Sequence, residues 1–470
     1  MVLSNSQWLA NPGVTYEIDQ SIRFNDDDSA FLARTPSASN RKTWTWSAWV
    51  KRANLFNGSV PQILLSAGDG GSNDFIMQFG QSDNTLRISD YIGGTQSNLI
   101  TTQLFGDVGA WYHFVLTYDT TQGTSGNRIK LFVNGSQVTS FGTETYPSEN
   151  ADLVINSAIA HNIGRGAYSS NGYFSGYMAE INFVDGTALA PTAFGETNTN
   201  GVWVPIAYAG SYGTEGYFID GRDSSDLGDD ESGNGNDFST SGLAANDQMS
   251  DSPTNNYCVL NALQQDATGL SNGNLQFTTS STSTHKMASA TIAQTSGKWY
   301  CEVTCNATLG SNARIGIIPE DNDNYTGSDG HVGDDANSFA YVDNGKKESN
   351  NSQSSYGASY ANGDVIAMAL NLDDNEITFY KDGSSQGTIS ITANTEYRFA
   401  ASQYNAGGMA FNFGQAAFAA TPPTGFKALN TDNLATPTIS DPSKYFQTTL
   451  YNGTGSELEV DQSGEESTFQ

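Results

Sequence analysis

The chain is poor in cysteine, and this shortage excludes two ways of holding a fold together. Its 470 residues include three cysteines, Cys258, Cys301 and Cys305. Cys301 and Cys305 lie four residues apart in one predicted strand, roughly 13 Å by strand rise, which is too far for a disulfide bond. Because the count is odd, no CxxC pair occurs and no histidine lies nearby, the cysteines predict neither a disulfide framework nor a zinc site.

Positive charge is also scarce. Lys and Arg together number 20 against 50 for Asp and Glu, which gives a formal net charge of -30. A field of that sign repels the phosphates of nucleic acid, so we expect no nucleic-acid partner. The acidic residues occur in short runs such as 26–28, a distribution typical of a solvated acidic surface.

Long apolar runs are missing. No segment approaches 18 apolar residues, and the first twenty, MVLSNSQWLANPGVTYEIDQ, contain neither a basic residue nor an apolar core. We therefore predict no membrane insertion and no classical secretory signal. The segment 431–470 resumes the alternation of strands and turns, so we expect it to begin a further domain or to form a docking strand.

Turn-forming residues are abundant. The 49 glycines against 12 prolines, with frequent Ser, Asn and Asp, predict many short strands. In KTWTWSAWVKR, the alternation places Trp44, Trp46, Ala48 and Val50 on one face, as expected of a sandwich core. Trp49 points the other way and is a candidate ligand-binding aromatic.

Tyr173 is a second ligand-binding candidate. It closes a predicted loop, and loops on a rigid scaffold often carry recognition. Near the start of the chain, Trp8, Leu9 and Tyr16 are apolar residues outside any complete strand pattern. We predict that they anchor an attachment arm.

The order of the first strands resembles a laminin-G-like, concanavalin A-type jelly roll. The matching pieces, between about residues 21 and 190, are WTWSAWVKR, WYHFVLTYD, IKLFVNGSQV and FSGYMAEINFVDGTAL. The resemblance implies an antiparallel sandwich of two sheets that binds glycans or proteins, often with calcium at one rim.

The second half resembles a SPRY domain. KWYCEVTC, ARIGIIPED, SFAYVDNGKK and GDVIAMALNLDDNEITFYKDG occur in that family's order, and the last piece is the most specific. The resemblance implies a bent β-sandwich whose rim loops bind partners and which carries no catalytic constellation. The residues agree, because 365–372 are largely apolar on both faces and 373–375 are turn formers.

The predicted fold class is therefore all-β, with tandem antiparallel β-sandwiches, a concanavalin A-like jelly roll followed by a SPRY-like sandwich. The predicted division is an attachment arm at 1–20, the jelly roll at 21–244, a linker at 245–271, the SPRY-like domain at 272–430 and the C-terminal segment at 431–470.

Catalytic signals are weak. The four histidines are scattered, and no G-x-S-x-G element occurs. Glycosidases of this fold would show Glu-x-Asp-x-Glu or a variant with one extra residue, and neither spacing is present. We predict that the chain is not an enzyme, although carboxylates from different strands leave hydrolysis open as an alternative.

Calcium is the one cofactor that the sequence suggests. In DLGDDESGNGNDF, residues 226–238, Asp230, Ser232, Asn234 and Gly235 match the first half of a calcium loop, but the twelfth position is Ser241 and not glutamate. This excludes an EF-hand. A looser site at Asp226, Asp230 and Asn234 stays open.

A rival calcium loop is AGDGGSND, with Asp69 and Asp74. It follows a strand at the place where laminin-G-like domains often hold calcium at the rim.

The domain pair, with RFNDDDSAFLARTPSASNRKTWTWSAWVKR and DSPTNNYCVLN, resembles virion proteins of tailed phages, particularly marine ones. That resemblance implies a structural protein assembled in the host cytoplasm and placed on the virion surface, on the tail in preference to the head. The implied partners are other virion proteins and a host glycan or envelope protein. Virion fibres are commonly trimers, which implies a homo-oligomer, although no heptad repeat is present.

Three functions remain open. The favoured one is a tail fibre or surface adhesin whose rim loops bind the host. The first alternative is a capsid decoration or head-fibre protein, and the second is a glycan-hydrolysing tailspike.

Overall fold

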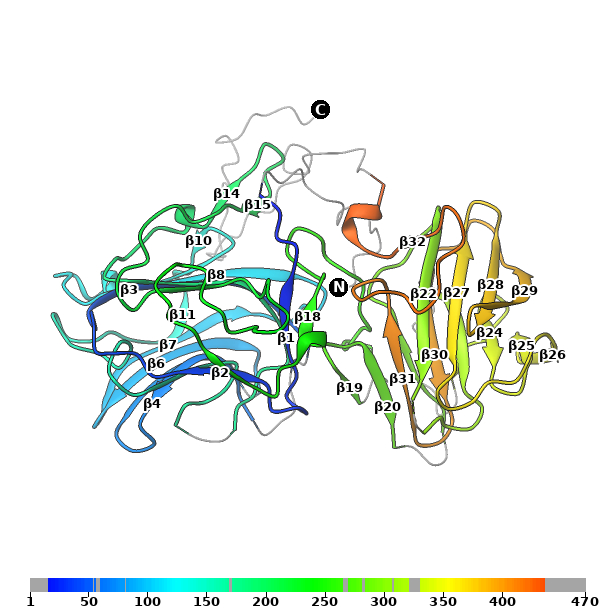
Figure 1. Cartoon of the computed structure of the whole chain (residues 1–470), viewed down its shortest axis with the longest axis horizontal. Coiled ribbons are helices and arrows are strands. Elements are labelled where there is room, and N and C mark those ends of the chain that lie inside the picture. The colour runs from blue at the N-terminus through cyan, green and yellow to red at the C-terminus, as the bar shows by residue number, and fades with distance from the viewer. Residues whose placement is uncertain are drawn as a thin grey trace, which may run out of the picture.

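Two β-sandwiches follow one another along the chain (Figure 1). The computed structural model describes residues 16–53, 55, 60–80, 82–168, 171–264, 269–280, 284–306, 308–320 and 330–435. The regular elements of these residues are strands and short 3-10 turns, so the predicted all-β class is confirmed. None of their helical turns is long and apolar enough to span a membrane.

One sheet of the first sandwich has the order β10-β9-β8-β3-β13-β1-β18, with β16 also paired to β13. Its strands are β1 (Ser21–Phe24), β3 (Thr43–Arg52), β8 (Trp111–Asp119), β9 (Ile129–Val133), β10 (Ser136–Gln137), β13 (Gly176–Asp185), β16 (Tyr217–Ile219) and β18 (Gln248–Met249).

The facing sheet has the order β11-β7-β6-β5-β4-β12-β2-β17. Its strands are β2 (Phe31–Arg34), β4 (Gln62–Gly68), β5 (Asn73–Phe79), β6 (Thr85–Ile92), β7 (Thr95–Leu104), β11 (Phe141–Thr145), β12 (Ala160–Ile163) and β17 (Ser239–Ser241). A separate hairpin joins β14 (Gly195–Thr197) to β15 (Trp203–Pro205).

The second sandwich has one sheet in the order β19-β20-β31-β22-β27-β28-β29, with β32 added in parallel to β22, and another in the order β21-β30-β23-β24-β25-β26. The strands of the first of these sheets are β19 (Leu270–Ser271), β20 (Gln276–Thr279), β22 (Lys298–Cys305), β27 (Val365–Asn371), β28 (Glu376–Lys381), β29 (Ser384–Ser390), β31 (Gly407–Asn412) and β32 (Lys427–Ala428). Those of the second are β21 (Lys286–Ser289), β23 (Arg314–Pro319), β24 (Phe339–Val342), β25 (Lys346–Ser349), β26 (Ser352–Ser355) and β30 (Tyr397–Gln403). Four 3-10 turns complete the described elements: η2 (Ser125–Asn127), η3 (Pro191–Ala193), η4 (Ala245–Asp247) and η5 (Thr431–Asn433).

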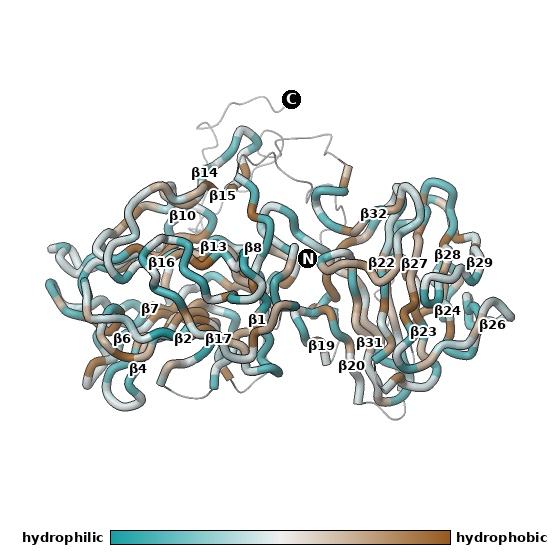
Figure 2. Tube along the Cα trace, viewed as in Figure 1, coloured by the Kyte–Doolittle hydropathy of each residue, from teal (hydrophilic) through white to brown (hydrophobic). Residues whose placement is uncertain are grey.

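The core of the first sandwich is aromatic, as the alternation in β3 predicts. Trp44 and Trp46 are fully buried. The Trp44 ring stacks on Tyr118 with centroids 4.2 Å apart and meets Phe75 edge-on at 5.8 Å. Figure 2 shows hydrophobic segments in the strands of both sandwiches and many hydrophilic residues in the connections between them.

One carboxyl group lies inside this aromatic core. Asp90 is fully buried, and its Oδ2 accepts hydrogen bonds from the Tyr118 hydroxyl and the Ser97 hydroxyl, both at 2.9 Å. Burial disfavours the charged form and raises the pKa of Asp90 to about 6.

The predicted central hairpin of the second sandwich is confirmed. β27 and β28 pair as antiparallel neighbours from Ile366 with Lys381 to Asn371 with Glu376. Asn375 takes a φ of 57° in the turn between them, a conformation that asparagine tolerates better than most residues. The three cysteines, Cys258, Cys301 and Cys305, are buried and unpaired.

A buried ion pair joins the two sandwiches. Lys51, in β3, donates through Nζ to Asp251 Oδ2 and Asn256 Oδ1, both at 2.7 Å, and to the Tyr257 carbonyl at 3.0 Å. The Lys51 and Asp251 side chains are 0% and 1% exposed. Asp251 Oδ1 accepts from the indole of Trp111 at 3.2 Å. A buried charge pair with this many partners holds its elements in one arrangement.

Within the segment 245–271, predicted as a linker, residues 247–261 are packed at this junction. Gln248–Met249 form β18, which pairs with β1, whereas Met249 and Cys258 pack in the core of the second sandwich. The Tyr177 hydroxyl of the first sandwich donates to the Gly273 carbonyl of the second at 2.7 Å. The structure therefore differs from the sequence prediction, because contacts with both sandwiches bury a segment whose local composition resembles a tether.

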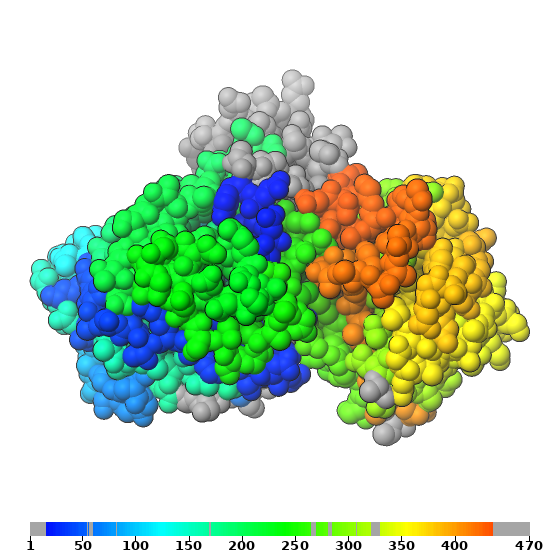
Figure 3. Space-filling model, viewed as in Figure 1, coloured from blue at the N-terminus to red at the C-terminus, as the bar shows by residue number. Residues whose placement is uncertain are grey.

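Both ends of the described chain reach the junction. The amide of Ile18 donates to Thr254 Oγ1 at 2.9 Å, and the amide of Asn256 donates to Thr431 Oγ1 at 2.9 Å. Figure 3 shows the N-terminal residues in blue and the last described residues in orange on either side of the green junction. Residues 16–20 and 431–435 are thus part of the folded body, and the remainder of the predicted arm and C-terminal segment lies outside the described residues.

Candidate functional site

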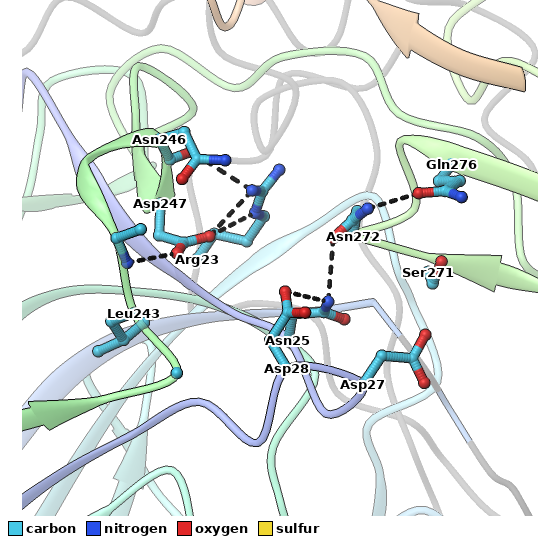
Figure 4. Close-up of a pocket in the computed structure, with 12 residues that line it drawn as sticks. Arg23, Asn25, Asp27, Asp28, Leu243, Asn246, Asp247, Ser271, Asn272 and Gln276 are labelled. Carbon is cyan, nitrogen blue, oxygen red and sulfur yellow. Dashed lines mark hydrogen bonds and ion pairs between the residues drawn. The ribbon is translucent and has the colours of Figure 1, made fainter. Parts of the chain in front are cut away.

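A polar groove of about 700 Å³ lies between the two sandwiches (Figure 4). The first sandwich contributes β1, the turn that follows it and the segment before β18, and the second contributes β19 and β20. The lining residues are Arg23, Asn25, Asp27, Asp28, Gly242, Leu243, Ala244, Asn246, Asp247, Ser271, Asn272 and Gln276.

The groove is ordered by its own hydrogen bonds. Arg23 is held against Asp247, whose Oδ1 accepts from Nε at 3.1 Å and from Nη2 at 2.9 Å. Asn25 Nδ2 donates to Asp28 Oδ2 at 2.7 Å and, across the groove, to Asn272 Oδ1 at 3.0 Å. Figure 4 shows this last bond joining the two walls. A ligand here would meet side chains that are already oriented.

The chemistry of this lining suits hydroxyl groups. Amides offer donors and acceptors together, carboxylates accept, and the Arg23 guanidinium donates, so adjacent hydroxyls that both donate and accept can be matched. Asp27 and Asp28 are exposed, and Figure 4 draws no bond from Asp27 to the other labelled residues. Leu243 and Ala244 are the apolar members, so the groove has little surface for an apolar ligand.

In the 226–238 loop, the predicted calcium ligands Asp226, Asp230 and Asn234 make hydrogen bonds to their own chain. Asp230 is buried, and its Oδ1 accepts from the amides of Phe218 and Ser232 at 2.8 and 2.9 Å. Its Oδ2 accepts from the Ser232 hydroxyl at 2.9 Å and the Asn236 amide at 2.8 Å.

The other two predicted ligands of this loop turn elsewhere. Asn234 donates through Nδ2 to the carbonyls of Gly213 and Gly216, and Asp226 accepts from the Gly228 amide. The carboxylate oxygens of this loop therefore accept hydrogen bonds from N–H groups of the same chain, and these bonds hold the loop closed. Among the described residues, no three His, Cys, Asp or Glu side chains converge as a metal site.

The second predicted calcium loop is only partly engaged. Asp69 accepts from the amides of Gly71, Ser72 and Asn73 and from Asn73 Nδ2, and these hydrogen bonds lower its pKa to about 2. Asp74 differs, since its buried Oδ1 has no hydrogen-bond partner in the described chain. Burial and the charge of Asp69 raise the pKa of Asp74.

Trp49, predicted as a ligand-binding aromatic, is covered by its own chain. It points away from the core as predicted, but it is 5% exposed and stacks on His113 with centroids 4.6 Å apart. Trp203 covers the pair from the β14–β15 hairpin and donates through Nε1 to His113 Nδ1 at 2.9 Å. Burial lowers the pKa of His113 to about 3, so the ring is neutral and serves packing.

Tyr16, predicted as an attachment residue, also packs against its own chain. Its hydroxyl lies 3.1 Å from both carboxylate oxygens of Glu180, and its ring packs beside Ile18 and Trp49. Glu180 sits in a bulge of β13 with a φ of 51°, and burial raises its pKa to about 7. The other predicted anchors, Trp8 and Leu9, lie outside the described residues.

Tyr173, the second predicted ligand-binding aromatic, is partly buried beside Phe31 and Arg165. Its ring centroid lies 6.3 Å from that of Phe31, and the Arg165 guanidinium carbon lies 5.8 Å from the Tyr173 centroid. Its role in binding stays a prediction.

Sequence reasoning missed the groove. Arg23 and Asn272 are about 250 positions apart, and no pattern in either segment marks a binding groove. The nearest local signal was Asn272-Gly273, a dipeptide that marks a turn but not what the turn faces. Only the packing of the two sandwiches brings these residues together.

Comparison with known families agrees with the laminin-G-like and the SPRY resemblances. Residues 24–193 match the profile of the Concanavalin A-like lectin/glucanases superfamily, and residues 298–416 match the SPRY domain. The chain therefore contains a concanavalin A-like domain of the laminin-G type followed by a SPRY domain. Domains of these kinds indicate a binding role.

Among solved structures, the chain is similar to the SPRY domain of human HERC1, with 16% identity, a TM-score of 0.27 and coverage of 35% of this chain and 96% of that one. It is also similar to a native heptameric SAP-like pentraxin from Limulus polyphemus, with 16% identity, a TM-score of 0.28 and coverage of 38% and 80%. No curated protein matches the chain.

Proposed function

We propose that this chain is a non-enzymatic binding protein of a phage virion surface, a tail fibre or adhesin that engages a host glycan or envelope protein. The pairing of two sandwich domains of binding type supports the first part of the proposal. The resemblance of the chain to virion proteins of tailed phages supports the second.

The observation that carries the binding proposal is the groove built by both sandwiches. Its convergent amides, carboxylates and guanidinium, with little apolar surface, match the hydroxyl groups of a glycan. The groove walls are oriented before a ligand arrives, which lowers the entropy lost on binding.

A glycan array probed with the full chain tests this proposal, followed by calorimetry on the glycans that bind. Gln276→Ala together with Asp27→Ala removes groups from both walls and is expected to weaken binding about tenfold, or 1.4 kcal/mol. Gln103→Ala, an exposed residue at the end of β7, is the matched control and should leave affinity unchanged. Equal loss in both variants, or no loss in the groove variant, would contradict the proposal.

Immunogold labelling of intact particles tests the location. Label on the tail supports the fibre or adhesin. Label on the head would replace it with the capsid decoration or head-fibre alternative, in which the same sandwiches dock onto other virion subunits. New reducing ends from a bound glycan during incubation with the chain would favour the tailspike alternative.

Attachment by the N-terminal arm is part of the same proposal. Because Tyr16 and Ile18 pack on the folded body, a deletion of residues 1–15 is cleaner than one of 1–20. It should abolish incorporation into particles without changing the unfolding transition. We also propose a homo-oligomer, for which light scattering of the full chain should give a mass above that of one subunit.

Calcium is proposed only for the Asp69–Asp74 loop. The unpartnered Asp74 Oδ1 and the raised pKa of Asp74 support it, because a cation would relieve the repulsion between the two carboxylates. Calorimetry with calcium, and melting with and without EGTA, test the idea. No heat and no shift in Tm would end it.

A further inference from the structure

The loop between β12 and β13 is fastened to the outer face of its sheet. Ser66, in β4, donates through Oγ to the Arg165 carbonyl at 2.6 Å and accepts from the Ala167 amide at 2.8 Å. The Gly164 amide donates to the Leu64 carbonyl at 3.0 Å, and Gly164 accepts from the Phe174 amide at 2.8 Å. Hydrogen bonds thus hold the Arg165 carbonyl and the backbone of Gly164 and Ala167, which lie before and after it.

The Arg165 side chain is also held in place. Its guanidinium carbon lies 3.9 Å from the centroid of the Phe31 ring and 5.8 Å from that of Tyr173. Phe31 follows the chain alternation to the outer face, because its neighbour Leu32 is fully buried in the core. We name Phe31, Arg165 and Tyr173 the Arg165 platform. All three side chains are partly buried and reach the surface.

The donors of Arg165 are mostly unused. Nε donates to the Gly166 carbonyl at 3.2 Å, and within the described chain neither terminal nitrogen has an acceptor. Each of the other nine arginines binds at least one protein oxygen through a terminal nitrogen. Tyr173 adds a hydroxyl that is likewise without a hydrogen-bond partner in that part of the chain.

An unpaired guanidinium is unexpected in a chain of net charge -30. Seven of the other arginines lie within ion-pair distance of a carboxylate, at side chains such as Asp247, Glu215 and Asp83. At physiological ionic strength the Debye length is about 8 Å, so carboxylates farther away than this act weakly on a small ligand at the platform. The local cation then decides what binds.

We infer that the Arg165 platform is a binding site for a carboxylate-bearing saccharide. Two terminal nitrogens of a planar guanidinium form a fork that matches the two oxygens of a carboxylate. The Tyr173 hydroxyl meets a ring hydroxyl of the same sugar, and the exposed part of its ring packs on the sugar C–H groups. This inference deepens the proposed glycan binding by naming an acidic sugar, and it places that sugar outside the groove.

The geometry favours a sugar over an acidic peptide. A hexuronic acid holds its carboxylate and hydroxyls on one rigid ring, so a fixed fork and a fixed hydroxyl are both matched with little entropy lost. A carboxylate on a flexible peptide side chain would contact the Arg165 guanidinium but would not place a hydroxyl group at Tyr173. The platform contains no exposed backbone strand to which a peptide would add.

The test compares a trisaccharide of galacturonic acid with its methyl ester, which removes the charge and keeps the rings. The full chain should bind the acid about tenfold tighter than the ester, a difference of 1.4 kcal/mol. Arg165→Met keeps much of the stacking volume and should abolish the preference. Arg165→Lys keeps the charge but loses the fork, so it should retain only part of the preference.

Arg87→Met is the matched control, because Arg87 lies on the same sheet and its Nη2 is already bound to Asp83 at 2.6 Å. It should bind the acid as the unaltered chain does. If Arg165→Met is poorly folded, Tyr173→Phe removes only the hydroxyl and should weaken the acid about threefold by losing one hydrogen bond.

Equal binding of acid and ester, or an unchanged preference in Arg165→Met, would overturn the inference. A triaspartate peptide that binds as tightly as the acid would overturn the choice of a sugar. Neutral glycans are measured on the same array: if they bind while the acid shows no preference, this inference fails and the proposed function stands.

Discussion

Two loops of the first sandwich differ in whether their polar groups are available. The 226–238 loop carries many carboxylates and amides, yet Asp230 accepts four hydrogen bonds from its own chain. The β12–β13 loop carries one arginine, and the terminal nitrogens of that arginine have no acceptor in the described chain. A polar side chain whose hydrogen-bonding capacity is already satisfied stabilises a loop, whereas an oriented side chain with capacity to spare can bind a ligand.

The largest effect on stability is expected at the junction. There, as in the 226–238 loop, the polar groups of segment 251–258 already have hydrogen-bond partners within the chain. Lys51→Met leaves the buried Asp251 without its cation and should lower the free energy of unfolding by about 3–5 kcal/mol in urea denaturation. Lys130→Met, on the same sheet and partly exposed, is the control and should change it by less than about 0.5 kcal/mol. Similar small losses in both variants would show that the junction is not held by the ion pair.

The 226–238 loop gives the next largest effect. Asp230→Ala leaves the amides of Phe218, Ser232 and Asn236 without their acceptor, so we expect a loss of about 3 kcal/mol in urea denaturation. Glu231→Ala alters the exposed neighbour and should be nearly neutral. A neutral Asp230→Ala would mean that the loop holds itself closed without this carboxylate, and the contrast with the β12–β13 loop would be lost.

Asp90 extends the comparison to the core of the first sandwich. Its carboxyl group accepts hydrogen bonds, as that of Asp230 does, but it is surrounded by aromatic rings. Its pKa is raised from 3.8 to about 6 on folding, so its contribution to stability is fully present below about pH 4 and is lost as pH rises to 6. The free energy of unfolding of the unaltered chain minus that of Asp90→Asn should therefore fall by up to about 3 kcal/mol between pH 4 and 7. Urea denaturation at several pH values measures this difference, and a constant difference would contradict the assigned direction.

The smallest effect on stability is expected at the Arg165 platform. Arg165→Met removes a partly exposed cation–π contact and should lower the free energy of unfolding by less than about 1 kcal/mol. Thermal melting beside the binding measurement separates the two roles. A loss as large as that of Asp230→Ala would place Arg165 with the structural residues.

The sequence predicted the fold from periodic patterns. The alternation of Trp44 and Trp46 with Thr45 and Ser47 placed the core face of β3, and the turn residues 373–375 placed the β27–β28 hairpin. These predictions succeed because side-chain direction alternates along a strand and the buried face must be apolar.

The candidate sites depend on contacts that local patterns do not contain. Trp49 was correctly placed on the outer face, but its cover comes from Trp203, more than 150 positions away. The spacing around Asp230 is the same whether its oxygens meet a cation or amides. Nothing in NIGRG distinguishes Arg165 from the arginines that find a carboxylate, because the difference lies in what surrounds each side chain.

The packed junction sets the spacing between the surfaces of the two sandwiches. Residues 250–261 contact both sandwiches, so their packing sets the distance between a ligand held by one sandwich and a ligand held by the other. Two ligand groups on a target surface can then be bound by one chain at the same time, with a gain in overall affinity, only when their spacing agrees with that distance. A cell envelope with repeating sugars at that spacing would retain such a protein far longer than one that displays the same sugars at random.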